Sequence, residues 1–262
     1  SETPGTTCLM AKKAMLSTKS QPEFEEVVVG TKSYIFENGI DELMFMPDNY
    51  VEVLYNLGAP ITRKLIGSIR SVVINTGDLV LSTCRSKGMS LSSESLNFLC
   101  AKVRPEYTML LYPKDVPLER DAVITLGMPR LENLAQFESH LDHLLEGIND
   151  FEPSFIVEEA VRIIQSTNGE VKIKDINEQL SVSKSFLEQR FAQEIGLSPK
   201  EFGKIEKMKH FLENYRQYQD SMTLTQLTFK SGYYDQSHLI KDFRYFMDSK
   251  PRDFIKAYHH IL

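Results

Sequence analysis

Residues 232–244 read GYYDQSHLIKDFR, and this short stretch decides much of the fold. Gly232 tolerates the positive φ that a tight turn requires. Asp235 is a favourable N-cap for the helix that follows, because its side chain can accept a hydrogen bond from the first helical turn. Leu239 and Phe243 lie four residues apart on one face of that helix. The stretch predicts a turn followed by a short helix whose polar side chains point outward.

A related pattern occurs 52 residues earlier in the chain. The segment FLEQRFAQEIGLSPKEF, which ends at Phe202, aligns with HLIKDFRYFMDSKPRDF, which ends at Phe254. The aligned apolar residues have helical spacing, and Ser183 can cap the helix of the earlier copy. A proline follows each copy at the start of another helix, Pro199 and Pro251, where its fixed φ fits. Each copy is therefore predicted to be a pair of helices joined by a tight turn, with one long helix between the copies.

The second helix of each copy has a polar outward face. The outward residues are Ser185, Glu188 and Gln189 in the first copy and Gln236, Ser237, Lys241 and Arg244 in the second. Such side chains can hydrogen-bond base edges or phosphates when a helix enters the major groove of DNA. Two such helices about one DNA turn apart, ~34 Å, would enter successive grooves on one face of a duplex. A single helix pair of this kind is also compatible with a solvated helical hairpin.

The order of these residues resembles the DNA-binding domain of AraC/XylS-type transcription regulators over about residues 155–258. The resemblance rests on Leu227-Thr228, Gly232-Tyr233, Ser237, Leu239, Phe243-Arg244 and the DSKP sequence of residues 248–251. It implies a sequence-specific DNA-binding transcription regulator, with the outward residues named above, apart from Arg244, at base-facing positions. Promoter DNA, RNA polymerase and a second copy of the chain are the partners that it implies.

This sequence departs from the usual pattern of that family at several positions. Asn177 and Thr228 stand where the family usually has a small alanine, and Asp248 stands where it usually has a glycine. Lys207 takes the place of an arginine in the linking helix, and Glu188 puts an acidic side chain on a face expected to meet phosphates.

Residues 24–127 have a different character. Short runs rich in Val, Ile, Leu and aromatic residues, such as VEVLYNL at 51–57, alternate with turn formers such as Gly77-Asp78. The expected fold class is α+β: a β-rich N-terminal sandwich or barrel domain, a connector helix, and an all-α C-terminal domain with two helix-turn-helix units. The predicted domains are a regulatory domain for sensing or dimerisation (residues 1–128), the connector helix (129–152) and the DNA-binding domain (153–262).

The connector carries an apolar stripe at steps of three and four residues. Its members are Leu134, Phe137, Leu141, Leu144 and Ile148, the spacing of a short coiled-coil seam. The stripe predicts a homodimer interface, and packing on the chain's own domain is the alternative. The resemblance favours the dimer.

Composition sets the class of protein. The chain has 262 residues, 42% hydrophobic and 25% charged, which is typical of a globular protein of two domains. No apolar run approaches the ~20 residues that span a bilayer, and the N-terminal residues lack the pattern of a secretory signal, so a cytoplasmic location is expected. Residues 151–262 hold 16 basic and 16 acidic residues. Their neutrality argues against a non-specific electrostatic binder of nucleic acid, so the DNA hypothesis rests on the pattern.

An enzyme and a protein-interaction module are the alternatives to a DNA-binding regulator. An enzyme with Cys84 or Cys100 as nucleophile would need a neighbour that lowers the thiol pKa, and no Ser/His/Asp or Cys/His arrangement is evident, so no enzyme is expected. The neutral charge and Glu188 motivate a protein-interaction module whose helix-turn-helix units no longer bind DNA. An apolar barrel could hold a small-molecule effector or simply fill its own core, and both remain open. No cofactor and no metal are expected, since no histidine precedes His140.

Overall fold

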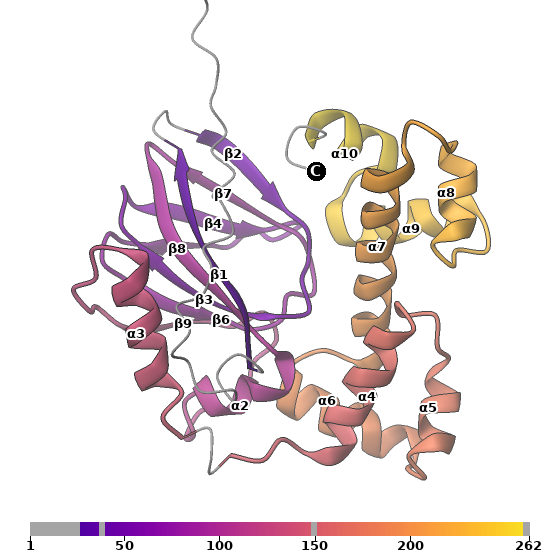
Figure 1. The fold of residues 1–262 in the computed structure, drawn as a ribbon, viewed down its shortest axis with the longest axis horizontal. Coiled ribbons are helices and arrows are strands. Elements are labelled where there is room, and N and C mark those ends of the chain that lie inside the picture. The colour runs from indigo at the N-terminus through magenta and orange to yellow at the C-terminus, as the bar shows by residue number, and fades with distance from the viewer. Residues whose placement is uncertain (1–26, 37–39, 148–150, 259–262) are drawn as a thin grey trace, which may run out of the picture.

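A computed structural model describes residues 27–36, 40–147 and 151–258 of the chain. The N-terminal part of this structure is β-rich and the C-terminal part is helical (Figure 1). The strands are β1 (Val28–Phe36), β2 (Ile40–Phe45), β3 (Val51–Asn56), β4 (Ile61–Leu65), β5 (Ser71–Ile74), β6 (Leu79–Ser82), β7 (Met89–Ser93), β8 (Leu96–Val103) and β9 (Val123–Gly127). The α+β prediction is confirmed.

The strands form two antiparallel sheets. One has five strands in the order β1-β8-β3-β6-β9, and the other has four in the order β2-β7-β4-β5. Side chains alternate between the two faces of the central strand β3, as the pleat requires. Leu54 packs into the core between the sheets, whereas Val53 and Tyr55 belong to a second core on the outer face of the five-stranded sheet. This sheet is therefore covered on both faces.

The outer face of the five-stranded sheet is covered by short helices. They are η1 (Pro105–Tyr107), α2 (Thr108–Leu111) and α3 (Leu134–Leu144). Helix α3 begins at Asn133, whose side chain accepts a hydrogen bond from the Gln136 backbone N–H, and it packs beside β1, where Thr31 Oγ1 donates to Glu138 at 2.6 Å. None of the helices among the described residues is long and apolar enough to span a membrane.

The helical part is built as the repeat predicted. Its elements are α4 (Phe155–Ser166), α5 (Ile173–Gln179), α6 (Lys184–Ile195), α7 (Pro199–Tyr218), α8 (Leu224–Lys230), α9 (Gln236–Met247) and α10 (Pro251–Tyr258). Helices α5 and α6 form the first helix-turn-helix unit, α8 and α9 form the second, and α7 joins them. The rings of Phe191 and Phe202 meet edge to face at 5.4 Å, and those of Phe211 and Phe243 at 5.8 Å. These aromatic contacts fix both units on α7.

The β domain packs directly on the helical part. Asn49 Nδ2 donates to the Phe202 carbonyl and to Glu206 Oε1, both at 2.8 Å. The Gly88 N–H donates to the Phe246 carbonyl at 2.8 Å, close to the C-terminal end of α9. One apolar cluster runs continuously from the outer face of the five-stranded sheet into the helices. The two parts of the chain thus share a core.

The apolar stripe of the connector is used inside the chain. Phe137 and Leu141 are buried on the β domain, and Leu134 and Leu144 are partly buried against the same core. Ile148 lies outside the described residues. Phe137 and Leu141 therefore pack on the chain's own β domain, which is the alternative that the spacing left open, and the homodimer stays a prediction.

Candidate nucleic-acid interface

Helix α6 is fixed by its ends and by its inner face. The Ser183 side chain accepts a hydrogen bond from the Phe186 backbone N–H at 3.2 Å, which confirms the predicted N-cap. Gly196 ends the helix with a φ of 84°, a conformation that favours glycine. Leu187 and Phe191 are fully buried, so the opposite side of α6 faces solvent.

Helix α9 repeats this plan. Gly232 has a φ of 75°, and the Asp235 side chain accepts a hydrogen bond from the His238 backbone N–H at 2.9 Å. Leu239 and Phe243 are buried. Asp248, where the related family usually has a glycine, ends the helix at a φ of 49°. The turn, cap and anchors predicted for residues 232–244 are all confirmed.

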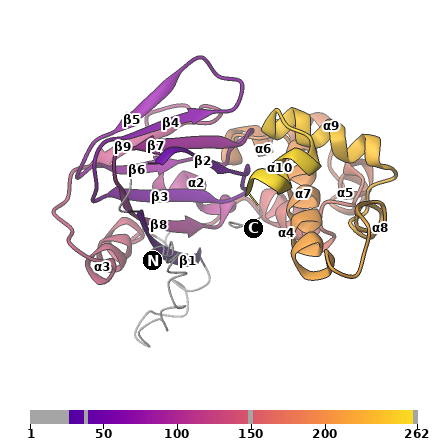
Figure 2. The same ribbon diagram turned by 90° about the horizontal axis from the view of Figure 1, so that it is seen from above.

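Helix α7 sets the separation of the two units. It has 20 residues, which corresponds to about 30 Å at a rise of 1.5 Å per residue. A capping box between Ser198 and Glu201 begins it at Pro199, as predicted. Helices α6 and α9 lie toward the same side of α7 in Figure 2. The first unit packs on α7 at Phe202 and the second at Phe211, nine residues or about 14 Å further along the helix.

Most of the outward residues predicted from the sequence are exposed. Ser185, Glu188 and Gln189 are exposed on α6, and Ser237, Lys241 and Arg244 are exposed on α9. Gln236 is half-buried and donates from Nε2 to Thr225 Oγ1 of α8 at 2.7 Å. Glu188 lies 3.7 Å from Lys184 in an ion pair, which offsets part of its charge on this face.

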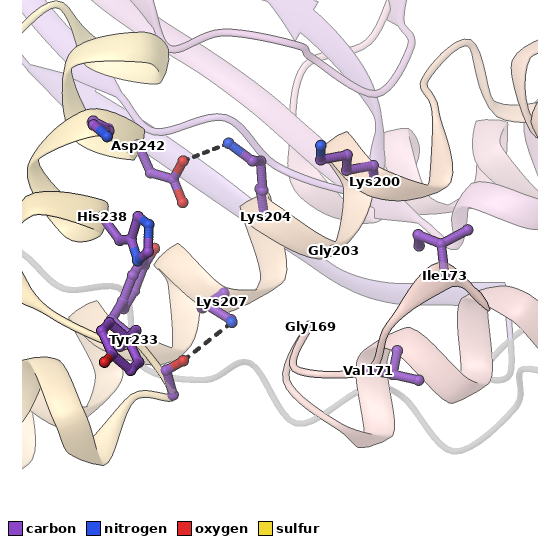
Figure 3. A pocket seen from close by; sticks show the side chains of 13 residues that line it. Gly169, Val171, Ile173, Lys200, Gly203, Lys204, Lys207, Tyr233, His238 and Asp242 are labelled. Carbon is purple, nitrogen blue, oxygen red and sulfur yellow. Dashed lines mark hydrogen bonds and ion pairs between the residues drawn. The ribbon is translucent and has the colours of Figure 1, made fainter. Parts of the chain in front are cut away.

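A lysine-rich cleft lies between the two units, and the sequence analysis missed it. Its floor is α7, with Lys200, Lys204 and Lys207, and Lys241 of α9 lines one wall (Figure 3). The cleft has a volume of about 340 Å³. The lysines at 200, 204 and 207 follow the helical i, i+4, i+7 pattern, which was the signal that could have revealed a shared face. Their meeting with Lys241 depends on tertiary packing.

A second cavity, of about 230 Å³, lies in the β domain where it meets α7 and α10. Its walls are largely apolar, with Met44, Leu91 and Phe98 among them, and Arg216 and Lys102 contribute cationic groups. Arg216 makes no ion pair to another described residue. The cavity therefore joins an apolar space to a positive charge.

The cavity also contains a buried ion pair. The Arg85 guanidinium is bonded to the Glu52 carboxylate, and its Nε has no hydrogen-bond partner among the described residues. Lys102 is paired with Asp48. Burial opposes the charge of Asp48, but the neighbouring Lys102 and Lys209 outweigh it and lower the pKa of that carboxyl.

Neither cysteine of the β domain has the surroundings of a nucleophile. Cys84 and Cys100 are buried free thiols, and burial raises the pKa of both well above the usual range. Nearby Asp48 raises the Cys84 pKa further, and Glu52 does the same for Cys100. Across the described ranges no group of His, Cys, Asp and Glu is arranged to hold a metal ion.

Comparison with known proteins identifies both halves of this arrangement. A helix-turn-helix domain family matches residues 176–257. No curated protein matches the chain. The solved structure of ToxT from Vibrio cholerae is similar over 86% of this chain and 97% of its own, with 13% identity and a TM-score of 0.53.

Two further ToxT structures from Vibrio cholerae carry ligands. One is wild-type ToxT with an unsaturated fatty acid bound, at 12% identity, covering 87% of this chain and 95% of its own, with a TM-score of 0.53. The other is ToxT bound to (E)-4-(8-methylnaphthalen-1-yl)but-3-enoic acid, at 13% identity, 86% and 97% coverage and a TM-score of 0.53. At such low identity these similarities show a shared fold, with a β-rich N-terminal domain before the helical part.

The matched family, the two capped recognition helices and the shared fold agree with the resemblance found in the sequence. Residues 176–257 form a helix-turn-helix domain, as the resemblance to AraC/XylS-type transcription regulators implied.

Proposed function

We propose that the chain regulates transcription by inserting α6 and α9 into successive major grooves of promoter DNA. The observation that carries this proposal is the pair of recognition helices, each capped and anchored, on one side of a helix about 30 Å long. The residues proposed to contact DNA are Ser185, Glu188 and Gln189 on α6 and Gln236, Ser237, Lys241 and Arg244 on α9, all of them base-facing except Arg244. In this proposal residues 1–128 regulate, residues 129–152 connect the two domains and residues 153–262 bind DNA.

Alanine substitutions on the two helices test this assignment. Gln189→Ala should relax base preference in one block of the DNA site by about 1–3 kcal/mol, and Ser237→Ala should do so in the other block. Affinities are measured for the preferred duplex and for duplexes changed in one block at a time. Lys174→Gln, which alters an exposed lysine of α5, is the matched control. Equal losses on all duplexes would contradict base reading by these helices.

A small-molecule effector is the second part of the proposal. The cavity between the β domain and α7 pairs apolar walls with Arg216 and Lys102, which suits a small carboxylate with an apolar body. ToxT has the same fold and has been solved with an unsaturated fatty acid. We therefore assign the cavity to an amphipathic carboxylate.

Thermal unfolding with matched ligands tests the effector site. Octanoate should raise the melting temperature of the wild type, because a ligand that binds the folded state stabilises it, whereas octylamine should not. Arg216→Gln should remove most of the octanoate effect. An equal effect of octanoate on the wild type and on Arg216→Gln would place its binding elsewhere.

The remaining features follow from the regulator role. The chain acts in the cytoplasm, needs no enzymatic activity, and meets RNA polymerase at the promoter. It functions as a homodimer, and because α3 uses its apolar stripe within the chain, the pairing surface lies outside Phe137 and Leu141. Sedimentation of the purified chain at micromolar concentration tests the dimer.

A further inference from the structure

The cleft between the two helix-turn-helix units shares only Lys241 with the base-facing residues proposed for α6 and α9. Its floor is the lysine row of α7, and its walls come from different units. The turn at Gly169 and Val171 forms the wall on the first unit, and Tyr234, His238 and Lys241 form the wall on the second. The cleft thus lies between the two units that the proposed function places on DNA.

The side chains that line the cleft carry a net positive charge, although residues 151–262 are neutral overall. Four lysines line it against one carboxylate, Asp242, which is paired with Lys204 at 2.7 Å. Lys207 Nζ donates to the Gly232 carbonyl at 3.2 Å, and the Glu170 carboxylate lies against Gly232 at the same turn. Lys200 and Lys241 form no ion pair with any described residue, and both are exposed.

The layout of the lysines fits a chain of phosphates. Lys200, Lys204 and Lys207 span two turns of α7, an axial distance of about 10 Å. Successive phosphates of one DNA strand advance by about 3.4 Å along the duplex axis, so the row is as long as about three of them. The β domain lies behind the cleft in the close-up view (Figure 3).

We propose that this cleft seats backbone phosphates of the DNA strand that passes from one major groove to the next. This inference rests on the proposed function and deepens it. The phosphodiester oxygens accept hydrogen bonds from Lys200 and Lys207, while Lys204 stays with Asp242 and Lys241 with the base-facing residues. Contacts of this kind fix the register of a protein on a duplex without reading its sequence. The cleft accordingly sets where α6 and α9 meet their bases.

The salt dependence of DNA binding tests the inference. Each phosphate contact contributes about 0.9 to the slope of log affinity against log salt concentration. Lys200→Gln removes an exposed group without an ion pair, so it should leave the fold intact and reduce the slope by about 0.9. The loss of affinity should be the same fold-change on preferred and scrambled duplexes. Lys256→Gln, on the exposed surface of α10, is the matched control and should leave the slope unchanged.

Uncharged linkages in the DNA backbone show which phosphates the cleft contacts. Methylphosphonate linkages placed midway between the two base blocks should weaken DNA binding by the wild type. The same linkages should weaken DNA binding by Lys200→Gln much less. Lys207→Gln is a second variant, used after its melting temperature has been checked because Lys207 also holds the Gly232 carbonyl. An unchanged slope in both variants, or equal losses from methylphosphonate in wild type and variants, would overturn the inference.

The lysines of the cleft would also suit a free polyanion, so binding of DNA phosphates must be distinguished from binding of a free anion. Failure of the cleft inference must also be distinguished from failure of the proposed function. Tripolyphosphate is therefore titrated against the wild type and Lys200→Gln. Tripolyphosphate binding that depends on Lys200 while the DNA slope does not would assign the cleft to a free anion and overturn the DNA assignment. If no duplex is preferred by the wild type, the proposed function fails, whereas a preferred duplex with an unchanged slope defeats only the cleft inference.

Discussion

At the scale of single residues, one glycine determines how closely the first helix-turn-helix unit approaches α7. Gly169 has a φ of 73°, and a Cβ at this position would overlap the carbonyl oxygen of Gly203 on α7. The turn after α4 can lie this close to the helix only because Gly169 carries no side chain, whereas a Cβ at Gly203 would meet no atom closer than 3.7 Å. This contact narrows the lysine cleft on one side.

Gly169→Ala should therefore destabilise the protein. The left-handed backbone conformation and the overlap with Gly203 should together lower the free energy of unfolding by about 1–3 kcal/mol, as measured by urea denaturation. Gly30→Ala is the control, because a Cβ at Gly30 meets no atom within 4 Å. Equal stability of the two variants would contradict the conclusion that the turn at Gly169 lies too close to α7 for a side chain.

The two buried thiols should react slowly. Burial holds the pKa of Cys84 and Cys100 above the usual range, so the thiolate is scarce at neutral pH. Iodoacetamide should modify neither residue in a folded Cys8→Ser variant at pH 7, and both in urea, as read by mass spectrometry. Rapid labelling of either native thiol would revive the hypothesis of a cysteine nucleophile.

At the scale of elements, the caps decide where the recognition helices begin. Asp235→Ala removes the acceptor for the His238 N–H and should cost about 1 kcal/mol of stability. Asp235→Asn keeps a side-chain acceptor and should cost much less. Thermal unfolding of the two variants measures the difference, and an equal effect would show that the cap hydrogen bond does not hold α9.

The helical elements could be predicted from the sequence because their signals are local. Ser183, Asp235 and Gly232 each act within a few residues, and the spacing of Leu239 and Phe243 sets the inner face of α9. The surface against which the apolar stripe of α3 packs could not be predicted, since the same spacing occurs in helices that form a dimer seam and in helices that lie on a sheet. The cleft was missed because Lys200 and Lys241 meet only after α9 packs on α7.

At the scale of the whole molecule, an ion pair joins the β domain to the start of α7. Arg120 donates to both oxygens of Glu201, at 2.5 and 3.1 Å, and the Tyr245 hydroxyl of α9 donates to the same carboxylate at 3.0 Å. Partial burial opposes ionisation of Glu201, but the hydrogen bonds from Arg120 and Ser198 outweigh it and lower its pKa to about 2. This cluster ties the β domain to the start of α7 and to α9 of the second helix-turn-helix unit.

The cluster should make stability depend on pH in a defined window. Because the folded pKa of Glu201 lies below the unfolded value of about 4.3, its contribution is complete above about pH 4.3. The contribution is lost as the pH falls toward 2. Glu201→Gln should therefore be less stable than the wild type at neutral pH, with the difference shrinking below pH 4.3. Glu213→Gln, an exposed site on the same helix, is the control, and a gap that stayed constant down to pH 2 would contradict the assignment.

The central claim is that two recognition helices read one face of a duplex, and selection of bound fragments from a random duplex library by the intact protein tests it most directly. The account predicts an enriched site with two short blocks whose centres lie about 10 base pairs apart, one turn of DNA. Absence of any enriched sequence at low salt, with and without a carboxylate ligand, would contradict it and favour a protein-interaction module with helix-turn-helix units that no longer bind DNA.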